Sequence, residues 1–289
     1  MRCSSLKRSL LIPQMRNEES QNKTRLDNPL HALSQNDSRN LNPQLRCDVA
    51  LPVAGRQRST FAKHNMSAMV HQVQNRGFTL VRKLLPHSAI DDLTSSLGAA
   101  SSAGQRGMLV HPLVHQFSTS ARTLDVVRPF LPDSPRPVRA IYFDKSPSSN
   151  WLVAWHQDLT ISVAHQAETP GFGPWSTKDG LIHVQPPVSV LQNMITLRLH
   201  LDDTDATNGA LRLLPGSHCH GRLTAPDIER LRATTPEETC RASRGDALLM
   251  RPLILHASGR STSDGHRRIL HIEYAGSDLP HGLIWNHAA

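Results

Sequence analysis

The pattern of apolar and polar residues divides the chain near residue 76. Before this position Asn, Gln, Ser and Arg predominate, and no helical or strand period persists over residues 1–65. A segment of this composition cannot bury enough apolar area to offset the entropy lost on ordering it. We therefore predict a disordered basic tail over residues 1–65 and one domain over residues 66–289. An alternative is that the protein starts at Met66 and that the tail is spurious.

The remainder of the chain shows the short apolar runs and turn residues of a mainly β protein. Strands are predicted at 77–81, 138–143, 151–155, 194–201, 210–214, 246–250, 253–257 and 267–274. Many short strands separated by turn signals indicate a β-sandwich or a β-barrel.

Turn and cap signals complete this outline. Ser88 is expected to cap a helix that runs to Leu97, with Asp91 as its capping-box partner, and a second helical piece is expected over 119–130. The pair Asn208-Gly209 predicts a hairpin turn. Residues 164–190, which are rich in Pro and Gly, predict a long loop, and such loops in compact domains are usually functional or disordered.

Charge and apolar content exclude several classes of protein. The formal charge is +8, but residues 1–65 hold 11 Lys and Arg against 5 Asp and Glu, so the predicted domain is near neutral. A nucleic-acid-binding protein needs a basic face on its folded part, so no nucleic-acid partner is expected. No apolar run approaches the roughly 18 residues of a membrane span or forms a signal-peptide core. We therefore expect a cytoplasmic protein without a membrane partner, whose four cysteines are reduced.

Two His-x-Asp pairs are candidates for metal ligands. His156-Gln157-Asp158 follows the predicted strand 151–155, and residues i and i+2 of an extended chain point the same way, so this imidazole and carboxylate can bind one ion. The pair His200-Leu201-Asp202 instead enters an acidic turn, where its carboxylate is better explained as a turn residue. The first pair is therefore the preferred candidate.

A third ligand has to come from a distant part of the sequence. His256 ends the predicted strand over 253–257 and stands 100 residues after His156. Two histidines and one carboxylate on one face of the coordination sphere form the non-haem Fe(II) oxygenase site, whose open positions admit a co-substrate and O₂. Taken alone, His256 is better explained as a core histidine of a β-strand.

Arginine near the third ligand suggests a binding site for an acidic co-substrate. Arg267 lies 11 residues after His256, and its planar guanidinium can pair bidentately with a carboxylate. Ser258 offers an additional hydroxyl donor. The alternative is that Arg267 and Arg268 form surface salt bridges. Strand alternation places Arg268, not Arg267, on the more apolar face, and so favours Arg268 as the arginine that points inward.

Taken together, these segments resemble the phytanoyl-CoA dioxygenase family of Fe(II)- and 2-oxoglutarate-dependent oxygenases. The resemblance extends from Arg76 to Tyr274, and order and spacing agree with the family throughout. Its motifs are Trp155-His156-Gln157-Asp158, Leu201-Asp202-Asp203-Thr204, Asn208-Gly209-Ala210-Leu211, Leu214-Pro215-Gly216-Ser217-His218, and Gly245-Asp246 followed by His256 and Arg267.

The resemblance implies a double-stranded β-helix, that is, a cupin-like jelly roll with flanking helices. It implies His156, Asp158 and His256 as iron ligands and Arg267 as the residue that anchors 2-oxoglutarate. It implies that the enzyme requires Fe(II), 2-oxoglutarate and O₂, with ascorbate as an accessory reductant. The implied reaction hydroxylates a small-molecule or acyl substrate and releases succinate and CO₂. Halogenating relatives lack the carboxylate ligand, so Asp158 favours hydroxylation.

Two other functions use the same residues. A zinc-dependent hydrolase could use the same three ligands, although the sequence shows no general base for its bound water. A non-catalytic cupin-like binding protein is the second alternative. The sequence predicts neither the substrate nor the oligomeric state. Trp155, Phe172 and Trp175 are candidate walls of a substrate pocket, and Lys145 and Arg139 are candidates to bind an acidic group of the substrate.

Overall fold

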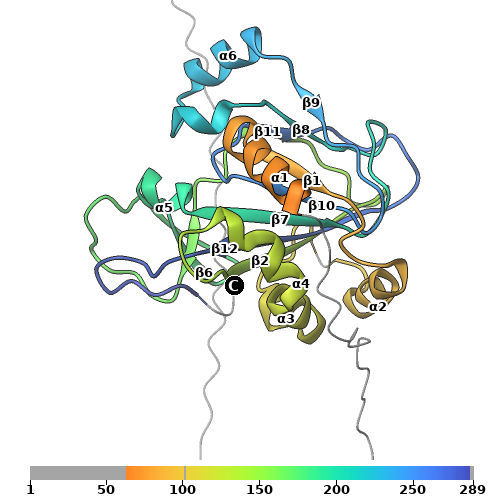
Figure 1. Cartoon of the computed structure of the whole chain (residues 1–289), viewed down its shortest axis with the longest axis horizontal. Coiled ribbons are helices and arrows are strands. Elements are labelled where there is room, and N and C mark those ends of the chain that lie inside the picture. The colour runs from red at the N-terminus through yellow and green to blue at the C-terminus, as the bar shows by residue number, and fades with distance from the viewer. Residues whose placement is uncertain (1–62, 101, 287–289) are drawn as a thin grey trace, which may run out of the picture. The chain divides into compact units, whose positions relative to one another are not determined.

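The computed structural model describes residues 63–100 and 102–286, with side chains described from Met66 onward. The tail predicted over residues 1–65 lies outside these residues, apart from the first three positions of helix α1 (Figure 1). The helices are α1 (Lys63–Arg76), α2 (His87–Leu97), α3 (Pro112–Thr119), α4 (Ala121–Val127), α5 (Val188–Gln192) and α6 (Ala225–Thr234). The 3₁₀ turns are η1 (Met108–Val110), η2 (Arg128–Phe130) and η3 (Ser217–His220).

Twelve strands make up the rest of the regular structure of the described residues. They are β1 (Phe78–Val81), β2 (Arg136–Lys145), β3 (Val153–His156), β4 (Ile161–Val163), β5 (Trp175–Lys178), β6 (Leu181–Val184), β7 (Met194–His200), β8 (Leu211–Leu213), β9 (Glu238–Thr239), β10 (Ala247–Met250), β11 (His256–Ser258) and β12 (Arg267–Ala275).

The strands pair in three antiparallel sheets. The first has the order β1-β10-β7-β12-β2, the second β3-β11-β8-β9, and the third β4-β6-β5. Leu248 and Met250 of the first sheet and Leu211 and Leu213 of the second belong to one buried apolar cluster, which joins the two sheets. The chain therefore folds as a double-stranded β-helix, which confirms the predicted fold class.

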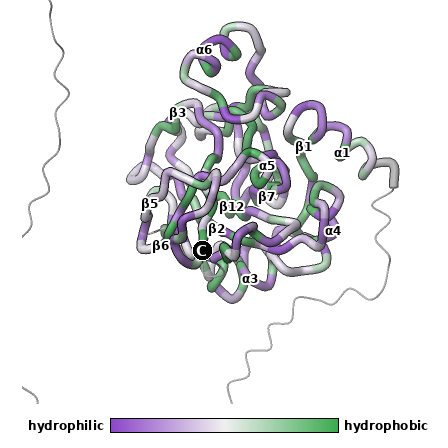
Figure 2. Tube along the Cα trace, turned by 90° about the vertical axis from the view of Figure 1, so that its left-hand side faces the viewer, coloured by the Kyte–Doolittle hydropathy of each residue, from purple (hydrophilic) through white to green (hydrophobic). Residues whose placement is uncertain are grey.

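Helices cover the other face of the first sheet. Ile90 of α2 and Phe117 of α3 pack with Leu270 and Ile272 of β12 in the largest apolar cluster of the described residues. Figure 1 shows α1, α3 and α4 lying against this sheet, and in Figure 2 apolar stretches, in green, run through the strands. The first sheet is consequently buried on both faces.

Helix α6 covers the second sheet in a similar way. Thr224 caps it, because its hydroxyl accepts from the backbone N–H of Asp227 while the Asp227 carboxylate accepts from Thr224 in return. Leu231 of α6 then packs on Leu214 and Leu255 beside the sheet. The cap fixes where the helix begins, and the leucine fixes its orientation.

Several local predictions differ from the structure. Helix α2 begins at His87 with Pro86 as its N-cap, so Ser88 lies within the first turn. Proline offers no polar side-chain atom that could cap the helix, and Asp91 pairs with Arg244. The helical piece expected over 119–130 is divided between the end of α3, α4 and η2, and Ser120 caps α4. Helix α1 was not predicted, because few apolar residues mark its buried side.

Two loop predictions were wrong. The segment 164–190 contains the hairpin β5–β6 and helix α5. Asp179 and Gly180 form the hairpin turn, both with positive φ as a tight two-residue turn requires. The pair Asn208-Gly209 does turn the chain, but it does not form a hairpin, because β7 and β8 lie in different sheets.

Two expectations from composition concern features that the structure describes only in part. No helix within 63–100 or 102–286 is long and apolar enough to span a membrane. Cys219 and Cys240 are free thiols, whereas Cys3 and Cys47 lie outside the described residues.

Candidate metal centre

The two histidines of the predicted triad lie opposite each other on paired strands. β3 and β11 are antiparallel neighbours, and His256 is the direct partner of His156, with 4.2 Å between the ring centroids. His256 begins β11 instead of ending a strand, because the chain turns over residues 252–254. Asp158 follows β3, and its backbone N–H donates to the carbonyl of Pro252 at 2.9 Å. The structure thus brings all three predicted ligands together.

Hydrogen bonds to the backbone fix the orientation of both imidazoles. His156 Nδ1 donates to the carbonyl of Ala154 at 2.8 Å, and His256 Nδ1 donates to that of Ile254 at 2.9 Å. Each ring therefore presents an Nε2 lone pair, and these atoms lie 3.7 Å and 3.8 Å from the two oxygens of Asp158. A hydrogen bond from the second ring nitrogen is the usual way in which a metal-binding histidine is oriented.

Burial sets the protonation states of the site. Burial lowers the pKa of His256 to about 4, so its imidazole is neutral at pH 7. Burial opposes ionisation of Asp158, but the surrounding His256, His271 and His156 hold the pKa of its carboxyl below the usual range. A neutral imidazole and an ionised carboxylate are the forms that bind metals.

The donor set fits a divalent metal. The ligand atoms of His156, Asp158 and His256 all lie within 4.8 Å of one another. Asp158 Oδ2 is buried and has no hydrogen-bond partner among the described residues. A buried carboxylate oxygen without a partner is costly, and a bound cation would satisfy it. Two imidazoles with one carboxylate are the ligands that non-haem iron uses.

Gln157, between the two ligands, holds the surrounding loops. Its amide donates to the carbonyls of Gly221 and Leu253 at 2.8 and 2.7 Å, and its oxygen accepts from the N–H of Leu223 at 2.8 Å. The side chain points away from the ligands on either side, as strand alternation requires. The middle residue of the His-x-Asp pair therefore has a structural task, which the sequence analysis did not identify.

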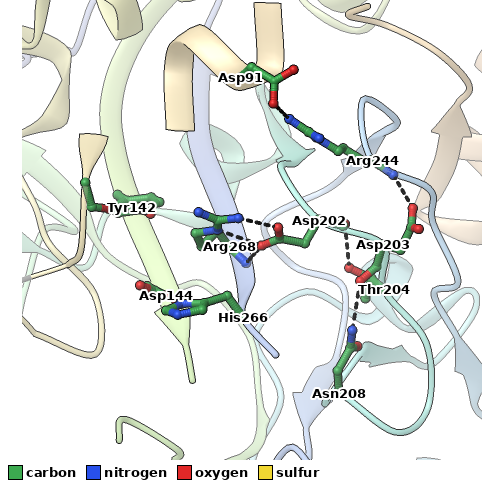
Figure 3. Close-up of polar contacts among 11 residues, drawn as sticks. Asp91, Tyr142, Asp144, Asp202, Asp203, Thr204, Asn208, Arg244, His266 and Arg268 are labelled. Carbon is green, nitrogen blue, oxygen red and sulfur yellow. Dashed lines mark hydrogen bonds and ion pairs between the residues drawn. The ribbon is translucent and has the colours of Figure 1, made fainter. Parts of the chain in front are cut away.

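The two adjacent arginines have different surroundings. Arg267 is buried, and no hydrogen bond or ion pair joins its guanidinium to another described residue. Arg268 pairs with Asp202 through two contacts of 2.9 and 2.6 Å, and Figure 3 shows it turned toward that carboxylate. Ser258, also buried, accepts from Lys145 Nζ at 2.9 Å, and Lys145 is the cross-strand partner of Arg267. Arg267 is thus a buried cation without a partner among the described residues.

Arg198, His271 and Glu273, which the sequence analysis did not assign, also line this interior. Arg198 Nη1 donates to His271 Nδ1 at 2.7 Å, and His271 Nε2 lies 3.3 Å from Glu273, which forms an ion pair with Arg139. His271 and Glu273 alternate with apolar residues along β12, and Arg198 does so along β7. This alternation of charged and apolar residues within buried strands was the signal that could have identified them.

Two other sequence expectations concern residues outside the ligand set. His200 is buried and contacts Thr204 at 2.9 Å, and it is absent from the ligand groups found among the described residues. Trp155 packs beside Leu214 and Leu231, and its ring lies under the guanidinium groups of Arg212 and Arg232, with which it lines a surface pocket. Its role as a wall of the substrate site stays a prediction. Phe172 and Trp175 pack in the apolar cluster around the third sheet.

A double-stranded β-helix that holds two histidines and a carboxylate at neighbouring strand ends defines a class of metal-dependent cupin-like proteins. Comparison with known proteins narrows this class. A sequence profile of phytanoyl-CoA dioxygenase (PhyH) matches residues 73–269, more than half of the chain. The chain belongs to the phytanoyl-CoA dioxygenase family, as the motif resemblance predicted.

One curated relative is the probable alpha-ketoglutarate-dependent hypophosphite dioxygenase of Stutzerimonas stutzeri. It is 27% identical over 174 residues, which are 55% of this chain and 51% of the relative. The chain thus spans about half the length of that relative.

Solved structures share the fold at low sequence identity. EctD from S. alaskensis, solved with 2-oxoglutarate and 5-hydroxyectoine, has a TM-score of 0.57 at 13% identity over 73% of this chain and 76% of its own. The non-heme alpha ketoglutarate dependent carbocyclase SnoK, from nogalamycin biosynthesis, has a TM-score of 0.56 at 15% identity, covering 73% and 84%. HygX from Streptomyces hygroscopicus, solved with iron bound, has a TM-score of 0.54 at 15% identity, covering 73% and 86%.

Proposed function

We propose that this protein is an Fe(II)- and 2-oxoglutarate-dependent oxygenase that hydroxylates a small molecule. The observation that carries the proposal is the convergence of two Nε2 atoms on Asp158, whose Oδ2 is buried and lacks a partner among the described residues. The reaction consumes the substrate, 2-oxoglutarate and O₂ and yields the hydroxylated substrate, succinate and CO₂. Iron held by His156, Asp158 and His256 would supply the redox chemistry that couples these changes.

Arg267 is the residue that we assign to the distal carboxylate of 2-oxoglutarate. Its burial and its lack of a partner among the described residues support this assignment. Burial, reinforced by the charge of Arg198, lowers the pKa of Arg267 to about 9, so the guanidinium is still cationic at pH 7. A carboxylate would form a charge-assisted, bidentate pair with it. Ser258 is the second residue that we assign to this carboxylate. Its hydroxyl donates to the carbonyl of Gly209 at 2.8 Å and accepts from Lys145 at 2.9 Å, so it would have to leave Gly209 in order to donate to 2-oxoglutarate.

Uncoupled turnover tests the proposal without knowledge of the substrate. The full chain is loaded with Fe(II) in the absence of oxygen, and O₂ and 2-oxoglutarate are then added while succinate is measured. We expect succinate formation that depends on Fe(II), and its loss in His156→Ala, Asp158→Ala and His256→Ala. His200→Ala replaces another buried histidine of the same interior and should retain iron and turnover.

The same measurements separate the alternatives. A zinc hydrolase would hold zinc in preference to iron and form no succinate, whereas a non-catalytic binding protein would form none with either metal. Undiminished succinate formation in all three triad variants would contradict the assignment of the ligands. A mass-spectrometric screen for products heavier by one oxygen atom then addresses the substrate. Hypophosphite belongs in the first panel, because the curated relative carries that substrate in its name.

A further inference from the structure

The interior of the β-helix holds more positive than negative charge. Four cationic side chains on the inner face of the first sheet are at most 7% exposed. They are Arg139 and Lys145 of β2, Arg198 of β7 and Arg267 of β12. Among the described residues, the carboxylates that face them are Asp158 and Glu273, and Asp202 acts on Arg267 from the edge of the interior. Because burying an uncompensated charge is costly, such a surplus indicates that anions bind there.

The carboxylates at the edge of this interior are already paired. Asp202 accepts two contacts from Arg268, and Asp246 accepts from Arg82 at 2.8 Å and from backbone N–H groups. Both arginine partners are more exposed than the carboxylates that they bind. These acids therefore do not offset the interior surplus.

Arg198 has only neutral direct contacts among the described residues. Its Nη1 donates to His271, and its guanidinium lies 5.5 Å from the centroid of the Phe143 ring. Glu273 forms an ion pair with Arg139 and reaches Arg198 only through His271. No carboxylate oxygen of the described residues forms an ion pair with Arg198, although it is 7% exposed.

The surplus persists when the proposed cofactors are counted. A divalent iron and a 2-oxoglutarate dianion cancel each other, so four cations still face two carboxylates. Burial lowers the pKa of Lys145 to about 7, so this group is only partly charged at neutral pH. Even with a neutral Lys145, one positive charge is left over, because three arginines face Asp158 and Glu273.

Position distinguishes Arg198 from Arg267. The ligand atoms of Asp158, His271 and Glu273 lie within 4.8 Å of one another, so Arg198 is one side chain away from the proposed iron site. Arg198 is the cross-strand partner of His271, four residues along β12 from Arg267. Four residues of an extended strand span roughly 13 Å. The two arginines therefore start from well-separated backbone positions, although the charges of both reach Lys145 and lower its pKa. Measuring the affinity for 2-oxoglutarate beside that for the substrate acid tells their roles apart.

We infer that the substrate to be oxidised is a small oxyanion, a carboxylate or a phosphorus oxyacid, and that Arg198 binds its anionic group beside the metal. This inference rests on the proposed function. The planar guanidinium suits both kinds of oxyanion, since each presents two oxygens to its fork. The oxidised atom of such a substrate lies within a few bonds of its anionic group, because Arg198 stands so close to Asp158.

Binding in the absence of oxygen tests the inference without turnover. The full chain is loaded with Fe(II) and saturating 2-oxoglutarate, and small acids are titrated by calorimetry and by melting temperature. Acetate, propionate and methylphosphonate represent the two kinds of oxyanion, and acetamide and propanol serve as neutral counterparts. At least one acid should bind more than about tenfold more tightly than its neutral counterpart, because only an acid pairs with a desolvated cation.

Arg198→Gln is the decisive variant. It should weaken binding of that acid at least about tenfold and leave the affinity for 2-oxoglutarate within about twofold. Arg198→Lys should restore part of the affinity, because it keeps the charge but loses the fork. Arg212→Gln, at an exposed arginine beside Glu237, is the matched control and should change neither affinity.

The outcomes are distinct. Equal binding of acids and neutral counterparts, or no binding of any acid at tens of millimolar, overturns the inference even if Arg198→Gln does not fold. Loss of 2-oxoglutarate affinity in Arg198→Gln, with acid binding unchanged, also overturns it. Uncoupled succinate formation is measured in parallel. If succinate is absent, the proposed function fails, whereas succinate formation with binding of neutral compounds alone contradicts only this inference.

Discussion

Single side chains of the site differ mainly in how their charge is compensated. Asp158 is surrounded by histidines, Glu273 holds Arg139, and Arg268 holds Asp202, whereas Arg267 holds no described residue. A buried group that is already paired contributes to the fold, and one that is unpaired is available to a ligand. This distinction, made residue by residue, underlies the assignment of Arg267.

Substitution of the two adjacent arginines tests that distinction. Removing one partner of a desolvated charged pair costs about 2–5 kcal/mol, and about 1.4 kcal/mol is tenfold in affinity. Arg267→Ala should therefore raise the apparent constant for 2-oxoglutarate at least about tenfold, while iron binding persists. Arg268→Ala should leave that constant unchanged, because Arg268 is engaged by Asp202. Titration of 2-oxoglutarate against uncoupled succinate formation measures both, and the reverse ranking would assign the anchor to Arg268.

We expect Lys145 to make the binding of 2-oxoglutarate dependent on pH. Burial, with the charges of Arg267, Arg198 and Arg260, lowers its pKa to about 7. Between about pH 7 and 10, Lys145 is protonated in the unfolded chain but not in the folded protein without ligands. The contribution of Lys145 to the free energy of unfolding therefore rises with pH through this window. A bound 2-oxoglutarate dianion favours the charged form of Lys145. Its affinity should therefore fall as pH rises from 6 to 8.5, and at pH 8 its binding should be accompanied by uptake of a proton by Lys145.

Calorimetry in two buffers of different ionisation enthalpy measures this proton uptake. Lys145→Met removes the titrating group and should abolish both the uptake and most of the pH dependence of the affinity. Persistence of the same proton uptake in Lys145→Met would show that another group is responsible.

At the scale of elements, the sequence predicted most strands but not what their faces meet. Alternation along β12 correctly placed Arg268 with Leu270 and Ile272 on the more apolar face, yet that face packs against helices. The interior is the other face, with Arg267 and His271. A local pattern cannot reveal which of two buried faces encloses a site, because that depends on which distant elements cover each face.

The same limit separates what could be predicted from what could not. The candidate ligands could be predicted, because the His-x-Asp pair and the third histidine are recognisable in the sequence itself. Helix α1 could not be predicted in this way. Val73, its buried residue, is buried only because distant elements lie beside the helix, namely β1 and η3. The Asn208-Gly209 turn was predicted as a hairpin, whereas only the pairing of β8 with β11 shows that the chain changes sheet there.

The turn before β10 offers a test at this scale. Gly245 has a φ of +89°, and a Cβ there would lie 2.5 Å from the carbonyl oxygen of Leu85, whose N–H donates to Gly245. Gly245→Ala therefore adds a left-handed backbone penalty of about 1–2 kcal/mol and a clash with the turn that leads into α2. About 2 kcal/mol corresponds to a fall in Tm of roughly 4–8 °C for a domain of this size.

Gly265→Ala is the matched control, because nothing lies within 4 Å of a Cβ at that position. It should leave the thermal transition within about 2 °C, since surface substitutions usually change stability by less than about 0.5 kcal/mol. Equal behaviour of the two variants in thermal denaturation would show that the contact with Leu85 does not constrain the turn.

At the scale of the whole domain, apolar clusters and a charged interior have opposite effects on stability. Helices bury one face of the first sheet, and the apolar part of the interior joins the two sheets. Beside that apolar part, buried cations and the unpartnered Asp158 oxygen destabilise the empty protein. Ligands that neutralise these groups bind the folded chain alone, so they should raise its stability.

Thermal denaturation with Mn(II), a redox-stable substitute for Fe(II), and 2-oxoglutarate measures this coupling. A ligand at a hundred times its Kd adds about 2.7 kcal/mol, and each 1 kcal/mol raises Tm by about 2–4 °C for a domain of this size, so each ligand should add roughly 5–11 °C. The rise caused by 2-oxoglutarate should need the metal, because the co-substrate binds partly through it. Asp158→Ala should abolish the response to Mn(II), and Arg267→Ala should abolish only the further rise caused by 2-oxoglutarate. A full response to both ligands in Asp158→Ala would place the binding site elsewhere in the chain.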